Sequence, residues 1–246
     1  MAVLAHEGTY SIMYGTWPIP VGTAHRRGYI ARPDAHGVFP VVIVVPTLDG
    51  LTSFEKDVCR SLARVGIAAV ALDPYAAPTG DPLEDYHRLS DTEAMSDLDE
   101  VYEFVMSEDV SWNAGEKVGL LGLDVGGRFA LAKAARASWV GGLVVVSTPL
   151  TGDEEREIQV ADHLSHLPLP VLGLYGAEDP LIDASTVDEA QNRNAHGQWL
   201  LYAGARHSFF DPNSEDYDAS AAADAMERIK AFFKATLPQA VVENLG

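Results

Sequence analysis

The chain has 246 residues, of which 47% are hydrophobic and 22% are charged, and its formal net charge at pH 7 is −19. This composition is typical of a globular protein long enough to bury a full sheet and its covering helices. The negative charge argues against nucleic acid and anionic membranes as partners, because both repel an acidic surface.

The N-terminal segment and the single cysteine bear on where the protein works. Residues 1–17 lack the basic region and apolar core of a secretory signal, and no apolar run is long enough to span a membrane. Cys59 has no second cysteine with which to form an internal disulfide. Its segment has the apolar spacing of an amphipathic helix, so we expect Cys59 to pack rather than react. We therefore expect a cytoplasmic protein.

The predicted elements alternate between strands and helices. Continuous apolar runs are typical of strands that are covered on both faces. In chain order, we predict an edge strand at 26–31, a strand at 41–45, a helix at 52–64, a strand at 67–72, a loop at 76–90, a helix at 91–106, a strand at 118–121, a helix at 126–137, strands at 143–146 and 171–175, a helix at 183–194, a strand at 199–202 and a helix at 216–237.

This alternation predicts an α/β fold, with a mostly parallel central sheet and helices on both faces. We expect one domain over residues 1–246, because the loop at 76–90 is too short for a lid domain. In such sheets, chemistry gathers beyond the carboxyl ends of the strands.

The segment Gly122-Leu123-Asp124-Val125-Gly126-Gly127 carries the strongest signal for chemistry. It lies between a predicted strand and a predicted helix, which is the context of a nucleophile elbow. Small residues two positions before and after Asp124 relieve crowding in such a turn, and aspartate tolerates a positive φ better than most residues. The alternative is that the glycines only allow close packing of the helix on the strand.

Two further segments supply partners for Asp124. Asp179 follows a predicted strand and is the candidate acid that orients a histidine, and the neighbouring Glu178 competes for this role. The alternative is that Asp179 only stabilises a turn. His207 follows the last predicted strand and is the candidate base. The order nucleophile, acid, histidine is that of α/β-hydrolases.

With these segments, the chain resembles the dienelactone hydrolase family over nearly its whole length. The resemblance rests on the elbow and on residues 40–44, 66–75, 175–179 and 207–210. It implies a compact α/β-hydrolase acting on small molecules, without metal or cofactor. The family's Cys-His-Asp triad would fall on Asp124, His207 and Asp179, and its backbone oxyanion donors on Leu48 and Val125.

Two departures from the family pattern make ordinary lactone hydrolysis doubtful. Asp124 stands where the family has cysteine or serine, and Thr47 stands where lactone-cleaving members have a glutamate that controls the ionisation of the cysteine. Without a cysteine that glutamate has no such role, and a second carboxylate near Asp124 would raise the pKa of one of the two.

An aspartate nucleophile suits an epoxide or a halogenated carbon, because attack leaves an alkyl ester that His207 and water then cleave. Two alternatives remain: a lyase, isomerase or cyclase with Asp124 or His207 as general base, and a scaffold that binds a small ligand without turnover. We also expect Thr47, Asp49, Tyr75 and Phe209 to contact substrate. The other histidines lack metal-ligand spacing. The oligomeric state, monomer or homodimer, is open.

Overall fold

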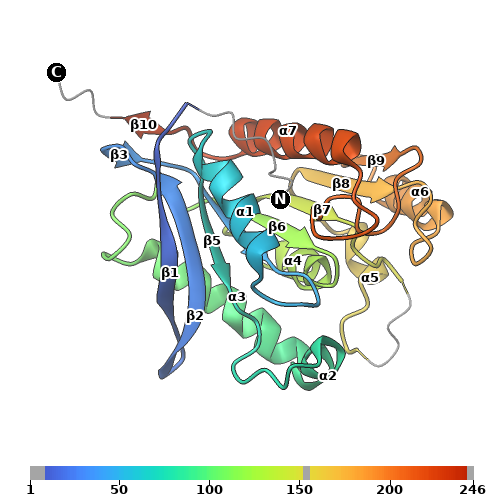
Figure 1. The fold of residues 1–246 in the computed structure, drawn as a ribbon, viewed down its shortest axis with the longest axis horizontal. Helices are drawn as coiled ribbons and strands as arrows, with labels where there is room; N and C mark the ends of the chain where they lie inside the picture. Colours follow the sequence, from blue (N-terminus) through green and yellow to red (C-terminus); the bar gives the residue numbers. More distant parts are fainter. Residues whose placement is uncertain (1–8, 152–155, 243–246) are drawn as a thin grey trace.

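The structure is a computed structural model that describes residues 9–151 and 156–242. Its centre is an eight-stranded sheet with the strand order β1-β2-β5-β4-β6-β7-β8-β9 (Figure 1). The sheet strands are β1 (Ile12–Val21), β2 (Ala24–Pro33), β4 (Val41–Val45), β5 (Ala68–Leu72), β6 (Val118–Leu123), β7 (Val140–Val146), β8 (Val171–Gly176) and β9 (Gln198–Tyr202). Strands β1 and β2 are antiparallel to their neighbours, and the others run parallel. The predicted α/β-hydrolase fold is confirmed.

Helices cover both faces of this sheet. Buried residues of α1 and α7 share one hydrophobic cluster with one face, and buried residues of α3 and α4 share another cluster with the opposite face. The helices are α1 (Ser53–Ala63), α2 (Pro82–Arg88), α3 (Asp91–Met106), α4 (Gly126–Ala134), α5 (Ala161–Leu164), α6 (Ala184–Arg193) and α7 (Ala219–Thr236). A second, two-stranded sheet pairs β3 (Gly37–Val38) with β10 (Val241–Val242).

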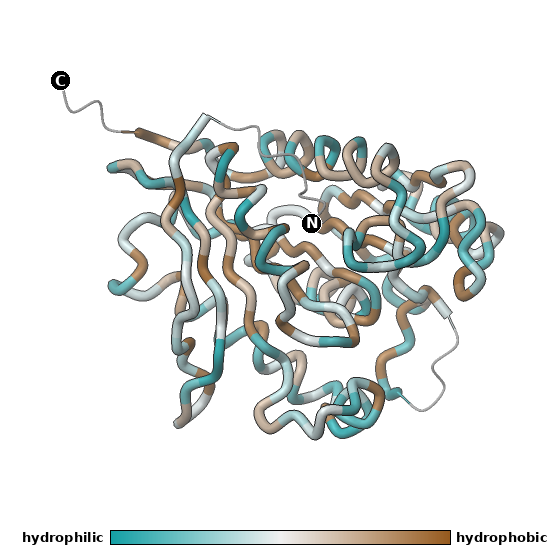
Figure 2. Tube along the Cα trace, in the orientation of Figure 1, coloured by the Kyte–Doolittle hydropathy of each residue, from teal (hydrophilic) through white to brown (hydrophobic). Residues whose placement is uncertain are grey.

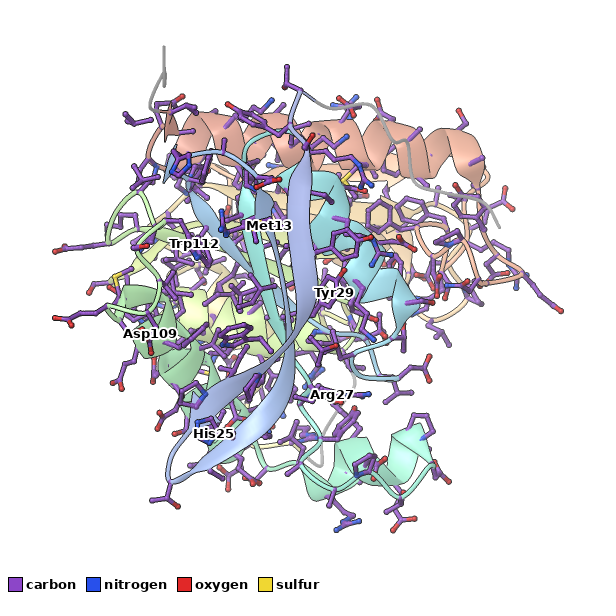
Figure 3. The ribbon with its side chains drawn as sticks, turned by 60° about the vertical axis from the view of Figure 1, so that its left-hand side comes forward. Met13, His25, Arg27, Tyr29, Asp109 and Trp112 are labelled. Atoms are coloured by element: carbon purple, nitrogen blue, oxygen red, sulfur yellow. The ribbon has the colours of Figure 1, made fainter. Side chains whose placement is uncertain are left out.

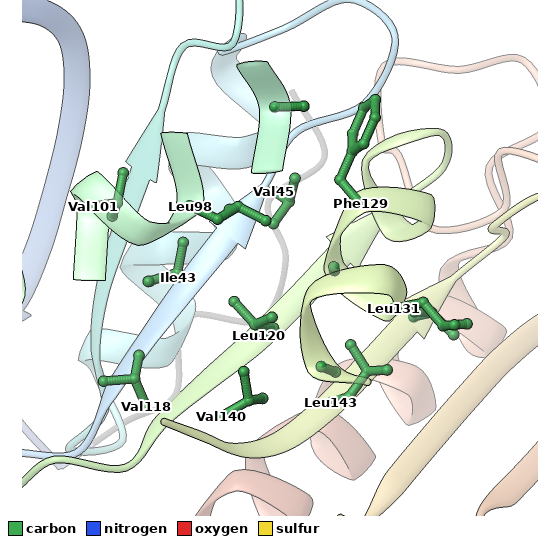
Figure 4. Packing of buried hydrophobic residues seen from close by; sticks show 14 of the residues in the cluster. Ile43, Val45, Leu98, Val101, Val118, Leu120, Phe129, Leu131, Val140 and Leu143 are labelled. Atoms are coloured by element: carbon green, nitrogen blue, oxygen red, sulfur yellow. The ribbon is translucent and has the colours of Figure 1, made fainter. Parts of the chain in front are cut away.

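The core explains why the central strands read as continuous apolar runs. Every residue of β4 and β5 is buried, because both sides of these strands face helices. Figure 2 shows the hydrophobic colouring concentrated on the inner strands. In Figure 4, Ile43 of β4 lies beside Leu98 and Val101 of α3. Leu120 of β6 and Leu131 of α4 belong to the same buried cluster.

Several local predictions need correction. The sheet edge is β1 rather than the strand at 26–31, which lies one position inward as part of β2. Most β1 side chains are at least partly exposed, so no apolar run marks this strand. The predicted loop at 76–90 contains α2, which begins at an Asp81 cap followed by Pro82, a standard helix-start pair. Figure 3 shows the β1–β2 ribbon in front, with Arg27 on β2.

Helix boundaries follow the capping residues. Helix α7 starts three residues later than predicted, because the Asp218 side chain accepts the Ser220 and Ala221 N–H groups. Helix α4 ends at Ala134, three residues before the predicted end.

The predicted absence of a secretory signal concerns residues 1–17, of which 1–8 lie outside the described part. Within the described residues, none of the helices is long and apolar enough to cross a membrane.

The sheet reverses its direction of growth between β4 and β6. From β4 the chain first adds β5 on one side, and it then returns to add β6 on the other. Such a switch point opens a crevice at the carboxyl ends of the two strands. The loop after β4, residues 46–50, and the turn after β6, which contains Asp124, therefore meet at one edge of the sheet.

Candidate active site

The turn between β6 and α4 holds Asp124 in a left-handed conformation with φ +48°. Its backbone N–H donates to the Val146 carbonyl at 2.9 Å, which ties the turn to β7. A Cβ at Gly122 would come within 2.3 Å of the Gly127 Cα, and a Cβ at Gly126 within 2.1 Å of the Pro46 carbonyl oxygen. Both glycines are therefore required by backbone contact. The elbow predicted from sequence is consistent with this geometry.

His207 lies between two carboxylates. Its Nδ1 is 2.8 Å from Asp179 Oδ2, and its Nε2 is 3.2 Å from Asp124 Oδ1. The side chain of Asp179 has no exposed surface, and its other oxygen accepts the N–H groups of Leu181 and Ile182 at 2.8 and 3.1 Å. These bonds fix Asp179 and, through it, the imidazole. Glu178, the competing acid, is exposed.

The two carboxylates control the charge of the imidazole. Burial would lower the pKa of His207, but the hydrogen bonds and charges of Asp124 and Asp179 outweigh burial and raise that pKa from 6.5 to about 9. His207 is consequently an imidazolium at neutral pH, bound on both sides by a carboxylate.

One of the two backbone N–H groups that the resemblance implies as oxyanion donors contacts Asp124. The Leu48 N–H points to Asp124 Oδ2, with a long N···O distance of 3.4 Å. Val125 opens α4 directly after the elbow. Its N–H has no hydrogen-bond partner within the described residues. The Leu48 N–H is therefore placed at the Asp124 carboxyl, whereas the expected role of Val125 stays a prediction.

Ser147 contacts the site, although the sequence analysis did not include it among the candidate site residues. It follows β7, has φ +48°, and donates from Oγ to the His207 carbonyl oxygen at 2.5 Å. A serine in the left-handed region costs conformational energy, and such strain gathers at functional sites. Its position just past a strand end was the available sequence signal. The contact itself joins residues 60 positions apart and could not be read from the sequence.

A cavity of about 100 Å³ opens beside Asp124 and His207. Thr47 and Asp49, two expected substrate contacts, lie in its wall. The other two expected contacts lie elsewhere. Phe209 is fully buried, and its neighbour Phe210 lines the cavity instead, while the Tyr75 hydroxyl donates to the Leu48 carbonyl at 2.8 Å. The lining residues are Thr47, Asp49, Phe54, Leu123, Asp124, Val146, Ser147, His207, Ser208, Phe210 and Asp211.

The charged lining side chains are acidic apart from His207. Asp49 and Asp211 join Asp124 in the cavity wall, and lysine and arginine are absent from the lining residues that the structure describes. Cys59 is fully buried, and burial raises the pKa of its thiol, so this thiol stays protonated and packs in the core. In the described ranges, no group of three or more His, Cys, Asp or Glu side chains is placed to hold a metal ion.

Comparison with known proteins places this geometry in a family context. The model of the dienelactone hydrolase family matches residues 26–237. Candidate carboxymethylenebutenolidases from Methylorubrum extorquens and Escherichia coli are each 30% identical over 244 residues, covering 91% of this chain and 81% and 88% of theirs. The crystal structure of a candidate dienelactone hydrolase from Klebsiella pneumoniae superposes with a TM-score of 0.82 at 26% identity, covering 91% of this chain and 98% of that one.

Proposed function

This chain belongs to the dienelactone hydrolase family of hydrolases, and from that premise we propose that it hydrolyses an epoxide or a halogenated carbon through a covalent ester on Asp124. The observation that carries the proposal is a carboxylate at the elbow, held 3.2 Å from a histidine that a second, buried carboxylate orients. Nucleophile, base and orienting acid then have the geometry that covalent catalysis needs.

The carboxylate separates this chain from the reaction for which its relatives are named. Those relatives carry the name of a butenolide, which is a lactone. Attack of Asp124 on a lactone carbonyl would give an acid anhydride, which is more reactive than the lactone itself. Attack on an sp³ carbon gives an ordinary alkyl ester instead, and relief of ring strain or loss of halide drives that step.

In the first half-reaction, an Asp124 carboxylate oxygen forms a bond to the electrophilic carbon. A carbon–halogen bond breaks and halide leaves, or an epoxide carbon–oxygen bond breaks and leaves an alkoxide. The alkoxide requires a proton, and the His207 imidazolium is the acidic group nearest to Asp124. The Tyr75 hydroxyl is already donated to the Leu48 carbonyl, so it is not the preferred acid.

Ester formation removes the negative charge of Asp124 and thereby prepares the second half-reaction. With one carboxylate neutralised, the pKa of His207 falls and the imidazole becomes a competent base. After epoxide opening, His207 has already given its proton to the alkoxide; after halide displacement, it first loses that proton to solvent. The imidazole takes a proton from water, the hydroxide adds to the Asp124 Cγ, and collapse breaks the ester bond and releases an alkoxide, which takes the proton from His207 to become the product alcohol. The Asp124 carboxylic acid that remains then passes its proton to His207, which restores the starting ion pair. The oxyanion of this step forms on the aspartyl carboxyl itself, where the Leu48 N–H already lies.

The test is intact-protein mass spectrometry of the His207→Ala variant after exposure to epoxides, haloalkanes, lactones and activated esters. His207→Ala removes the base of the second half-reaction, so we expect a stable adduct that peptide mapping assigns to Asp124. It also removes the acid that protonates the alkoxide of an opened epoxide, so a haloalkane should label Asp124 faster than an epoxide does. The control is the double variant with Asp124→Asn, which should stay unmodified. The adduct also names the substrate class.

Two other results would redirect the assignment. Adduct-free protein in combination with turnover of a test compound would favour Asp124 as a general base in a lyase, isomerase or cyclase. Binding without any consumption of ligand, in wild type as in the variants, would favour a non-catalytic scaffold. An adduct on a residue other than Asp124 contradicts the proposed nucleophile directly.

A further inference from the structure

Glu55 is a buried carboxylate close to the site that the proposed reaction does not use. It lies in the first turn of α1 with no exposed surface. Its carboxylate accepts two hydrogen bonds at each oxygen. Oε2 accepts the Thr52 N–H and hydroxyl at 2.8 and 2.6 Å, and Oε1 accepts the Thr47 hydroxyl and N–H at 2.8 and 3.3 Å.

Only half of this arrangement serves the helix. The bond from the Thr52 N–H to Glu55, together with the Thr52 side chain, forms the capping box of α1. A capping box needs only one of the two carboxylate oxygens. The second oxygen binds the loop after β4, so that Glu55 connects the start of α1 to Thr47, eight residues earlier in the chain.

Thr47 is the residue directly before the proposed oxyanion donor. Its peptide bond to Leu48 carries the N–H that points at Asp124 Oδ2. The loop is held from the other side as well, because the Tyr75 hydroxyl binds the Leu48 carbonyl at 2.8 Å. The Gly50 N–H binds the Thr47 carbonyl at 3.0 Å and closes the turn. Glu55 supplies the only side-chain anchor on Thr47 among the described residues.

The position of this carboxylate matters for a second reason. The family resemblance puts a glutamate at position 47, where this chain has threonine. Here a carboxylate reaches the same loop from α1, but both its oxygens are taken up by threonine donors and none of its surface faces the cavity. Glu55 is therefore placed to hold the loop and not to touch substrate.

We propose that Glu55 is a positioning residue which, through Thr47, holds the Leu48 N–H on the Asp124 carboxyl while the alkyl-enzyme ester is hydrolysed. The inference rests on the function proposed above. Because the oxyanion on Asp124 forms only in the second half-reaction, loss of the anchor should slow hydrolysis of the ester far more than its formation.

The variants are chosen to divide the two halves of the Glu55 contact. Glu55→Gln keeps one oxygen for the capping box but presents an NH₂ group to the Thr47 donors. Thr47→Val removes the hydroxyl and leaves the capping box intact. Thr52→Ala is the matched control, because it removes a cap hydroxyl and leaves the bonds between Thr47 and Glu55 in place.

The readout is the rate of each half-reaction, followed by rapid-quench mass spectrometry with the compound that labels Asp124 in His207→Ala. In Glu55→Gln and Thr47→Val, we expect ester hydrolysis to slow by about 10- to 100-fold, so that the alkyl-enzyme accumulates. The double variant should be no slower than the worse single variant, because both changes break the same contact. Thr52→Ala should lower the melting temperature and leave both rates near wild type.

Equal slowing of both half-reactions in Glu55→Gln and Thr47→Val, or wild-type hydrolysis in both, would overturn the positioning role. If nothing labels Asp124, the proposed function fails, and an amide measurement still decides the role of Glu55. In a ¹H–¹⁵N spectrum, Asp124→Asn should move the Leu48 amide resonance in the wild-type background but not in the Glu55→Gln background. The same movement in both backgrounds would show that Glu55 does not position this N–H.

Discussion

The charge of His207 can be tested by replacing one of its two carboxylate partners. Asp124→Asn keeps the size of the side chain and removes its charge. In the wild type, the pKa of His207 is raised to about 9 against burial, which corresponds to a few kcal/mol at about 1.4 kcal/mol per pH unit. Asp124 is the largest contributor to the rise, while burial is unchanged by the substitution. We therefore expect the pKa of His207 to fall from about 9 towards its ordinary value of 6.5 in Asp124→Asn.

The assay is a titration of the histidine ring resonances by NMR, with the signal of His207 assigned by its loss in His207→Ala. The same substitution also imitates the neutral ester of the alkyl-enzyme, so it reports whether His207 becomes a base at that stage. A wild-type pKa near 6.5, or an unchanged pKa in Asp124→Asn, would refute the electrostatic reasoning.

The pH dependence of protein stability is a second test of the charge on His207. The folded-state pKa of His207 lies above its unfolded value, so the folded protein binds the proton more tightly. This contribution to the free energy of unfolding is fully present below pH 6.5 and is lost as the pH rises through about 9. Chemical denaturation at pH 6 and at pH 9.5 should show a larger loss for the wild type than for Asp124→Asn.

Three further substitutions test the surroundings of the elbow. Gly126→Ala should destabilise the protein by about 1–3 kcal/mol and abolish activity, because the new Cβ meets the Pro46 carbonyl. The control is Gly15→Ala, where the new Cβ points into open space and thermal unfolding should be unchanged. Ser147→Ala should cost about 1 kcal/mol and speed amide exchange near His207; unchanged exchange would contradict a role in holding that loop. Asp124→Cys should release p-nitrophenol from p-nitrophenyl acetate, which the wild type and Asp124→Ala should not do.

The parallel core of the fold was readable from the sequence because its strands are buried on both faces. The runs at 41–45 and 67–72 predict β4 and β5 to within one residue. The edge was not readable in this way. β1 has partly exposed residues such as Tyr14 and Trp17 along its length, and its pairing with β2 depends on tertiary contact. Helix α2 was missed although its Asp81-Pro82 start is a local signal.

The residues of the candidate site also fall into those that the sequence predicted and those that only the folded structure shows. Asp124, Asp179 and His207 follow separate strands, and parallel strands bring their carboxyl ends to one edge of the sheet. This topology, the order of the three residues in the chain and the family resemblance together predicted that they meet. Glu55 and Ser147 could not be found in this way. Glu55 resembles any acidic residue in a first helical turn, and only the folded loop shows that its second oxygen binds Thr47.

The proposed mechanism changes what the oxyanion donors must recognise. With a cysteine or serine nucleophile, the oxyanion forms on the substrate, so the donors and the substrate carbonyl must fit one another. With Asp124 as nucleophile, the oxyanion forms on a protein atom that the Leu48 N–H already contacts in the free enzyme. The donors then need to fit only the Asp124 carboxyl and not the substrate. In this mechanism, substrates are selected by the rest of the cavity, whose wall includes Asp49, Asp211 and Phe210. We expect an acidic wall of this kind to disfavour a substrate that carries a carboxylate, because the like charges repel each other.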